Sequence, residues 1–381
     1  MDAVVKAVIE AIHASPTHAV LYLSGGGSQA LGWLLSVPRA SGTVLEVTVP
    51  YSRASMVQLL GKVPEQYVCR ETADAIAMAA YNRALKLSMP GMPVAGIGLT
   101  GALASVPPKR GDHRCHLSAR TQTGLWHYDL TLAKGYRDRV GEDLVTSRMV
   151  VKSLADVCGV SVGIPLELKE GSERLTEQRW SYSEEEQLEQ LLNGQICMIS
   201  FSSNADMTGS RRIILSGSFN PLHDGHVKLL EVACSLQEGT MPCFEISAIN
   251  ADKPPLGLGD VKDRVKQFRD IGKNLVLTNQ PYFYKKAELF PDSTFVVGVD
   301  TAIRLMNPKY YGESKTRMLE VLLGIHQQGC DFMVAGRKVN GRFKVLSDID
   351  IPAEVQHMFQ AIPENLFYSD LSSTALRQKT R

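Results

Sequence analysis

Two histidines three residues apart, His223 and His226, stand where a short apolar strand pattern gives way to a helical one. The segment reads RRIILSGSFNPLHDGHVKLLEVA, with a glycine-containing loop and an Asn220-Pro221 turn signal between the two patterns. Strand, loop and helix start in this order direct free backbone N–H groups and the positive end of a helix dipole at one point, which suits a phosphate. Residues three apart at a helix start share a face, so we expect both imidazoles to donate hydrogen bonds to one anion.

This segment resembles GSFNPxHxGH, a signature of the nucleotidylyltransferase superfamily, in which nicotinamide and nicotinate mononucleotide adenylyltransferases carry this wording. The family's second signature, (I)SSTxxR, resembles the LSSTALR sequence over 371–377. The two motifs stand in the family's order and about a domain length apart, which is far more specific than HxGH alone. The alternative is that His223 and His226 only cap a helix and that Arg377 is a surface charge.

The resemblance implies that the phosphate of an acceptor attacks the α-phosphorus of ATP or CTP and that pyrophosphate leaves. The nucleophile is already an anion, so the protein must align the reactants and stabilise shifting charge. The resemblance assigns this catalytic role to His223 and His226 on the triphosphate and to Arg377 on its β,γ-phosphates. Mg²⁺ is expected to be held by phosphate oxygens and water, so no metal-ligating residue is assigned.

Further nucleotide-binding residues are expected in four segments. Backbone amides of Ser216 to Phe219 would complete the phosphate cradle. Hydroxyls of Ser372 to Thr374, at the start of the last expected helix, would add to it. Lys253 lies in a loop where the family carries a lysine, the alternative being an exposed loop lysine. Asp300 ends a sequence that resembles the family's G-x-D, the alternative being a helix N-cap. The full set is Ser216, Gly217, Ser218, Phe219, Lys253, Asp300, Ser372, Ser373 and Thr374.

Composition narrows the class of protein. The 381 residues favour two or three domains, and 44% hydrophobic with 21% charged residues is typical of a soluble globular chain. Because 41 basic residues balance 40 acidic ones, we do not expect nucleic acid as a partner. The apolar runs have strand length, so no membrane span is expected. Seven scattered cysteines without C-x-x-C spacing fit a reducing compartment, and we expect a cytoplasmic protein.

Alternating helix and strand patterns predict an α/β fold throughout. We expect an N-terminal α/β domain over 1–160, a connecting segment and linker over 161–210, and a Rossmann-like nucleotidylyltransferase domain with a parallel sheet over 211–381. In the last domain, strands are expected at 212–216, 244–249, 275–278, 294–299 and 331–335. Residues 167–180 are polar and are interpreted as irregular, and 196–201 as a strand.

The first 160 residues resemble, in layout, the C-terminal domain of competence-induced protein A, a family that includes nicotinamide mononucleotide deamidases. Active relatives read AESxTGG and TYSNxxK where this chain reads LYLSGGG and PYSRASM. Leu23 then takes the position of the nucleophilic serine and Met56 that of the lysine, and neither can replace them chemically. Ser24 is one residue away and would face the other side of a strand. We expect no efficient deamidase, and a domain kept for homo-oligomerisation or ligand binding.

A histidine and cysteine cluster in the same domain, His113-x-Cys115-His116, is interpreted as a solvated polar loop. A metal site there would need a fourth ligand, and none has suitable spacing.

The motif wording favours a pyridine mononucleotide as the acceptor, which would give a dinucleotide such as NAD. The signature itself concerns only the triphosphate, so FMN, phosphopantetheine or a phospho-alcohol remain alternatives. A second class of function is a non-catalytic nucleotide sensor or scaffold. The intact HDGH and SSTALR sequences argue against this second class.

Overall fold

The computed structural model describes residues 1–161, 163–201, 211–249, 254–339 and 342–368. The chain forms two compact units, Met1–Gln187 and Leu188–Arg381. Each unit is built on its own sheet, as the α/β prediction requires. Among the described residues, no helix is long and apolar enough to cross a membrane.

The first unit contains a six-stranded sheet in the order β2-β1-β3-β4-β5-β6. The first three strands in this order are parallel, and the remaining pairs are antiparallel. The strands are β1 (His18–Ser24), β2 (Val44–Thr48), β3 (Val94–Ala102), β4 (His113–Arg120), β5 (Gly124–Leu132) and β6 (Arg174–Ser181).

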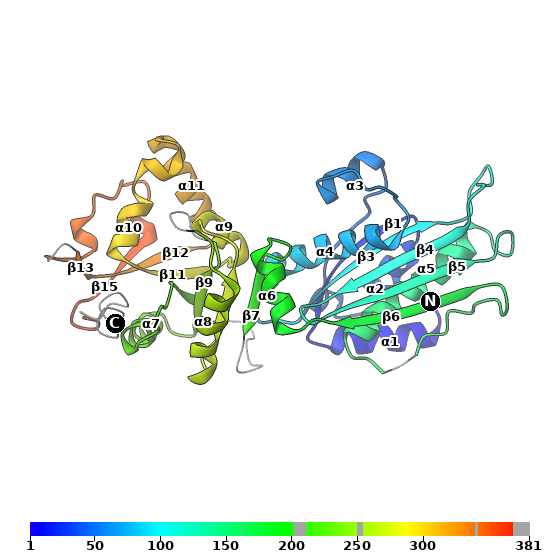
Figure 1. Ribbon diagram of the computed structural model, residues 1–381, viewed down its shortest axis with the longest axis horizontal. Helices are drawn as coiled ribbons and strands as arrows, with labels where there is room; N and C mark the ends of the chain where they lie inside the picture. The colour runs from blue at the N-terminus through cyan, green and yellow to red at the C-terminus, as the bar shows by residue number, and fades with distance from the viewer. Residues whose placement is uncertain (162, 202–210, 250–253, 340–341, 369–381) are drawn as a thin grey trace. The chain divides into compact units, whose positions relative to one another are not determined.

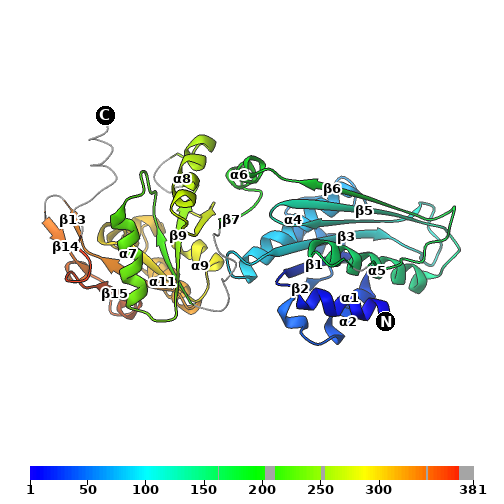
Figure 2. The same cartoon turned by 90° about the horizontal axis from the view of Figure 1, so that it is seen from below.

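Helices cover both faces of this sheet (Figure 2). On one face lie α1 (Ala3–Ala14), α2 (Ser28–Ser36) and α5 (Arg139–Val157), and on the other α3 (Arg53–Leu60) and α4 (Arg70–Leu87). The face of α4 that meets the sheet is formed largely by small residues, which let the helix approach closely: Ala73, Ala77, Ala80 and Ala84, all fully buried.

Two segments interpreted as non-strand are strands. The His113-x-Cys115-His116 sequence lies in β4, at the centre of the sheet, and the solvated-loop interpretation was wrong. Residues 174–181 form β6, an edge strand whose side chains are mostly exposed. Because a strand exposed on both faces shows no alternation of apolar residues, its pattern resembled that of an irregular segment.

The second unit contains a seven-stranded sheet in the order β15-β12-β11-β8-β9-β10-β7. All pairs are parallel except that of β7 with β10, which is antiparallel. The strands are β7 (Met198–Phe201), β8 (Arg212–Ser216), β9 (Met241–Ser247), β10 (Leu275–Thr278), β11 (Ser293–Gly298), β12 (Asp331–Ala335) and β15 (Phe359–Ile362); β13 (Arg337–Val339) and β14 (Arg342–Lys344) form a separate hairpin.

The expected connecting segment over 161–210 therefore contributes strands to both units. Its first part supplies β6 to one sheet, and its last described residues supply β7 to the other. Between them lies α6 (Glu184–Leu192). The described part of this segment is largely built into the two folds.

The helices of the second unit again cover both faces of their sheet (Figure 1). On one face lie α7 (Asp224–Ser235) and α8 (Leu258–Asp270), and on the other α9 (Phe283–Leu289), α10 (Val299–Leu305) and α11 (Lys315–Gln327). Two consecutive residues of β9, Phe244 and Glu245, point to opposite faces of the sheet. The Phe244 ring packs on Phe268 of α8 at 5.0 Å between centroids, whereas Glu245 reaches Lys286 of α9.

Chain order reverses between β8 and β11, which are neighbours in the sheet. Helices that follow these two strands leave toward opposite faces and open a crevice at the carboxyl edge. In doubly wound α/β sheets, this switch point is where ligands bind.

Candidate active site

A cavity of about 740 Å³ opens at this switch point. Residues at or just after the carboxyl ends of five strands line it: Ser216 (β8), Ser247 (β9), Pro281 (β10), Gly298 (β11) and Ala335 (β12). The five adjacent parallel strands of the sheet, in the order β12-β11-β8-β9-β10, thus contribute to one site. The sheet holds the loops, and the loops carry the polar groups.

The loop after β8 places all four of its predicted residues, Ser216 to Phe219, in the cavity wall. The Ser216 hydroxyl oxygen is buried and has no hydrogen-bond partner among the described residues. The sequence predicted that the Gly217 amide would bind phosphate. In the structure this amide is not free, because it donates to the Glu245 carbonyl at 3.0 Å. A side chain at Gly217 would come within 2.8 Å of the Phe219 ring. Only glycine allows this close packing.

Phe219 fixes the shape of the loop through its buried ring. Its backbone has φ of 42°, an unfavourable region for a bulky residue, and its ring is 1% exposed. The ring meets those of His226, Phe244 and Phe268 edge to face, at 4.9, 5.4 and 5.3 Å between centroids. Strained backbone held by surrounding packing is a feature of functional sites.

His223 and His226 stand together at the start of α7. His223 is the N-cap residue, and its backbone N–H donates to His226 Nδ1 at 3.3 Å. The two rings stack at 3.7 Å between centroids with planes 23° apart. His223 Nδ1 is buried and has no hydrogen-bond partner among the described residues. Two imidazoles and the open end of a helix therefore face the same cavity.

Both imidazoles are held neutral. Burial, together with the nearby His223 and Arg337, lowers the pKa of His226 to about 3. Burial also lowers the pKa of His223, although Asp224 opposes the shift and Arg337 adds to it. A neutral imidazole still donates one hydrogen bond, and a bound anion would favour the protonated form that donates two.

Asp300 lies in the first turn of α10, where Gly298 is the N-cap residue, so the alternative that Asp300 is the cap does not apply. Its carboxylate lines the cavity and is 3.6 Å from Arg337 and 3.8 Å from Arg304. At Gly298, a side chain would come within 2.6 Å of the Asp300 carboxylate. The carboxylate is 37% exposed and is positioned to accept hydrogen bonds from a ligand.

Sequence reasoning missed four charged residues that line the cavity: Arg337, Arg304, Arg264 and Lys286. Arg337 follows β12, at the same sheet edge as the other loops, and a basic residue after the end of a parallel strand was the available signal. Arg264 lies in α8, where an arginine at 8% exposure is unusual. Lys286 lies next to Lys285 in α9, and nothing in the sequence marks which of the two is buried.

Several predicted residues lie outside the described part of the chain: Lys253, Ser372, Ser373, Thr374 and Arg377. Tyr310 and Tyr311 both line the cavity. The Tyr311 hydroxyl donates to the Leu305 carbonyl at 3.1 Å, and burial raises its pKa to about 12. Tyr311 therefore has a packing role.

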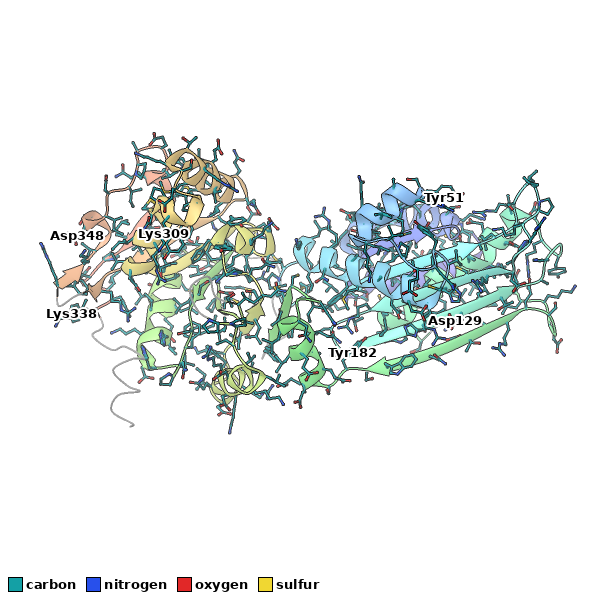
Figure 3. All side chains as sticks on the ribbon, turned by 45° about the horizontal axis from the view of Figure 1, so that its top comes forward. Tyr51, Asp129, Tyr182, Lys309, Lys338 and Asp348 are labelled. Atoms are coloured by element: carbon teal, nitrogen blue, oxygen red, sulfur yellow. The ribbon has the colours of Figure 1, made fainter. Side chains whose placement is uncertain are left out.

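A second cavity, of about 470 Å³, lies in the first unit beside the glycine loop that follows β1. Leu23 lines it, whereas Ser24 does not and instead donates to the Pro50 carbonyl at 3.3 Å. The serine that does line it is Ser28, whose hydroxyl donates to Asp143 at 2.8 Å. Tyr51, also at this cavity, is 72% exposed (Figure 3).

The histidines of β4 are bound to carboxylates. His113 Nδ1 lies 2.6 Å from Glu142, and His116 Nδ1 lies 2.6 Å from Asp129, which is marked on the sheet in Figure 3. Cys115 is fully buried, which raises the pKa of its thiol. Within the described ranges, no three His, Cys, Asp or Glu residues are grouped as metal ligands.

Comparison with known structures finds proteins similar to the N-terminal region. The competence/damage inducible protein CihA from Agrobacterium tumefaciens is 19% identical, with 41% of this chain and 97% of that chain covered and a TM-score of 0.34. A competence-damaged protein (CinA) superfamily protein from Escherichia coli is 13% identical, with 40% and 88% covered and a TM-score of 0.33. A competence or damage-inducible protein from Enterobacter asburiae is 13% identical, with 41% and 96% covered and a TM-score of 0.31.

A comparison with curated proteins finds no match. Residues 214–379, which include the loop after β8, the histidine pair and the whole described cavity edge, match the sequence model of the cytidylyltransferase-like family. The C-terminal part of the chain is therefore similar to the cytidylyltransferase-like family of the nucleotidyltransferase superfamily, and this match supports a nucleotidyltransferase enzyme.

Proposed function

We propose that the second unit transfers the nucleoside monophosphate of ATP, or of CTP, to the phosphate of a pyridine mononucleotide. Pyrophosphate is released, and the product is a dinucleotide such as NAD. The observation that carries the proposal is the pair of stacked imidazoles at the start of α7. Beside them, His223 Nδ1 and Ser216 Oγ are buried and lack partners among the described residues. Such atoms are costly unless a polar ligand pairs with them.

In this reaction, the residues of the chain bind and orient, and none needs to remove a proton. His223 and His226 donate hydrogen bonds to the triphosphate, and the dipole of α7 adds positive potential there. Arg337 contributes a permanent charge from the far side of the crevice, and we assign Arg377 to the β,γ-phosphates. Asp300 accepts hydrogen bonds from nucleotide hydroxyl or amino groups.

We propose that Mg²⁺ enters with the triphosphate as part of the substrate. In the described cavity wall, Asp300 is the carboxylate available to such an ion or to its water ligands. A hard cation bound mainly by phosphate oxygens needs few protein ligands. When bound, Mg²⁺ would neutralise charge that develops on the leaving pyrophosphate.

For the first unit, we propose a role in assembly and not in deamidation. Leu23 occupies the cavity wall where the sequence resemblance places a nucleophile, and Met56 is 3% exposed on α3. We further propose that the chain works in the cytoplasm, where its seven free thiols would stay reduced.

Pyrophosphate release tests the function. ATP and CTP are each combined with nicotinamide mononucleotide, nicotinate mononucleotide, FMN, phosphopantetheine and a phospho-alcohol, with and without Mg²⁺. We expect release with a pyridine mononucleotide and loss of it without Mg²⁺. Triphosphate binding with no pyrophosphate from any acceptor would instead support the nucleotide sensor. Release with another acceptor only would keep the transferase and replace its substrate.

The site is tested with His226→Ala. A donor that strengthens in the transition state is worth ~2.7–4 kcal/mol, so turnover should fall by about a hundredfold or more. His326→Ala is the matched control, because that imidazole lies in the last turn of α11, is 42% exposed and is not part of the described cavity wall. Unchanged turnover in a folded His226→Ala protein would remove the histidines from the mechanism.

A further inference from the structure

The wall of the cavity formed by α9 contains a buried ion pair that the mechanism above does not use. Lys286 Nζ donates to Glu245 Oε2 at 2.6 Å, and the two side chains are 7% and 0% exposed. Thr278 Oγ1 donates to Glu245 Oε1 at 2.7 Å. Both carboxylate oxygens are thus satisfied, while the ammonium has three N–H groups and gives one of them to Glu245.

This ion pair is connected, through one residue, to the loop after β8 that contains Ser216 to Phe219. The Glu245 side chain binds Lys286, and the Glu245 backbone carbonyl accepts the hydrogen bond from the Gly217 amide at 3.0 Å. Because Glu245 belongs to β9 next to β8, it fixes the ammonium relative to the loop. Lys286 therefore has a defined position in the site, unlike a lysine on a flexible surface stem.

A purely structural role explains the pair poorly. Burying two charges costs free energy that their attraction barely repays, and apolar residues of similar size often serve as well. The neighbouring Lys285 shows the ordinary arrangement, since it is 43% exposed and pairs with Glu288 on the same helix. Lys286 instead points inward, lines the cavity and lies 5.1 Å from the centroid of the Phe283 ring. Charged groups placed in this way in a cleft are candidates for function.

The proposed reaction has a use for such a cation. The acceptor must bring an anionic phosphate up to a triphosphate that is itself highly charged, and the two repel each other. His223 and His226 enter the cavity from the α7 face of the sheet. Lys286 enters from the α9 face, beside β9 and β10, and away from the Arg304 and Arg337 group beyond β11.

We propose that Lys286 binds the phosphate of the acceptor and that Glu245 is the residue that positions it. The inference rests on the proposed function, and it divides the cavity into two anion subsites. The triphosphate takes the subsite at the loop and α7, and the acceptor phosphate takes the one at Lys286. Any acceptor with a terminal phosphate meets this requirement, so the subsite selects the phosphate and leaves the choice of base to other residues.

The test uses the full chain and ribose 5-phosphate as the probe, with the triphosphate subsite filled by a non-hydrolysable ATP analogue. The variant Lys286→Met with Glu245→Gln removes both charges and leaves the Thr278 hydroxyl an acceptor, which avoids an unpaired buried carboxylate. We expect its affinity for ribose 5-phosphate to fall by about tenfold or more, because a charge-assisted hydrogen bond is lost. The affinity for the ATP analogue should stay within about twofold of the original.

Two further variants separate binding from structure. Lys286→Arg keeps a cation, and it should recover most of the affinity for ribose 5-phosphate. Lys285→Met removes the neighbouring exposed lysine and should change neither affinity. A melting temperature for each variant shows that the fold is retained.

Unchanged binding of ribose 5-phosphate in the double variant would overturn the proposal. So would an equal loss of the ATP analogue, or no binding of ribose 5-phosphate by the unaltered protein. If the ATP analogue fails to bind at all, the proposed function fails instead. The ribose 5-phosphate titration without the analogue then decides on Lys286 by itself.

Discussion

At the scale of single residues, the site depends on side chains held in protonation states that burial selects. Outside a protein, the imidazole of His226 would have a pKa of 6.5, and in the fold this pKa falls to about 3. Below pH 6.5 the unfolded chain therefore binds a proton that the folded chain excludes. Its contribution to stability is present above pH 6.5 and is lost as the pH falls toward about 3.

This pH dependence of the free energy of unfolding should differ measurably between the original chain and a variant without His226. From pH 7 to pH 5, protonation of His226 in the unfolded chain should lower the free energy of unfolding by up to about 2 kcal/mol. Urea titrations at both pH values should show a smaller acid-induced loss for His226→Asn than for the original chain. Equal losses in the two proteins would mean that His226 is not buried as a neutral group.

Arg337 is the second residue whose charge should be measurable. It lines the cavity and lies close enough to both imidazoles to lower the pKa of each. We expect Arg337→Gln to weaken ATP binding by about tenfold, as the loss of a charge-assisted hydrogen bond to phosphate would. Adenosine should bind as before, because it carries no phosphate. Arg342→Gln is the control, because Arg342 is the exposed first residue of β14. An equal loss of adenosine affinity in Arg337→Gln would contradict a phosphate role.

The histidine pair could be predicted because all its determinants lie in one short segment. Loop, turn, helix start and spacing are read directly from 212–226. Arg337, Lys286 and Glu245 could not be predicted in this way. Each comes from a different element, and they belong to one site only because parallel strands end at the same sheet edge.

At the scale of elements, buried strands were predictable, whereas the edge strand β6 and the sheet to which the edge strand β7 belongs were not. The strands β8, β10, β11 and β12 are short apolar runs that stand out from the sequence. The strand β6 is polar on both sides, and β7 was expected as a strand but not as part of the second sheet. Pairing partners of an edge strand are set by tertiary packing, which local patterns do not record.

Alternation along β1 yields a prediction for the first unit. Leu23 lines the cavity beside the glycine loop, while Ser24 donates to Pro50 and lies outside its wall. Without a nucleophile at Leu23 or an ionisable group at Met56, we expect no efficient release of ammonia from nicotinamide mononucleotide. The assay is run on the full chain, on Ser24→Ala and on Ser28→Ala. Robust release that either serine variant abolishes would identify an active deamidase and overturn the resemblance-based alignment.

At the scale of the whole molecule, the boundary between the units decides which fragments can fold. The second sheet includes β7, whose Met198 and Ile199 are buried at 1% and 0% exposure. A fragment of residues 188–381 keeps this strand, and one of residues 205–381 loses it. Losing both side chains removes at most about 3–6 kcal/mol of burial and leaves the edge of β10 unpaired.

We therefore expect 188–381 to unfold cooperatively and 205–381 to melt lower and aggregate. Calorimetry and light scattering measure both. The same scattering experiment tests assembly, since we expect the full chain to be larger than a monomer and 188–381 to contain fewer subunits. A monomeric full chain would contradict the assembly role of the first unit. Equal stability of the two fragments would show that β7 contributes little to the second fold.

The placement of β7 also bears on how such a two-part gene could have arisen. The match to the family model begins at residue 214, yet the sheet that carries the family signature takes an edge strand from 198–201. A recombination event that joined or exchanged the catalytic half at the start of its signature would leave that strand behind. A recombined gene whose product still folds would have to be joined upstream of the codons for β7. The segment inherited as a unit is then longer than the recognisable motif and includes residues with no part in chemistry.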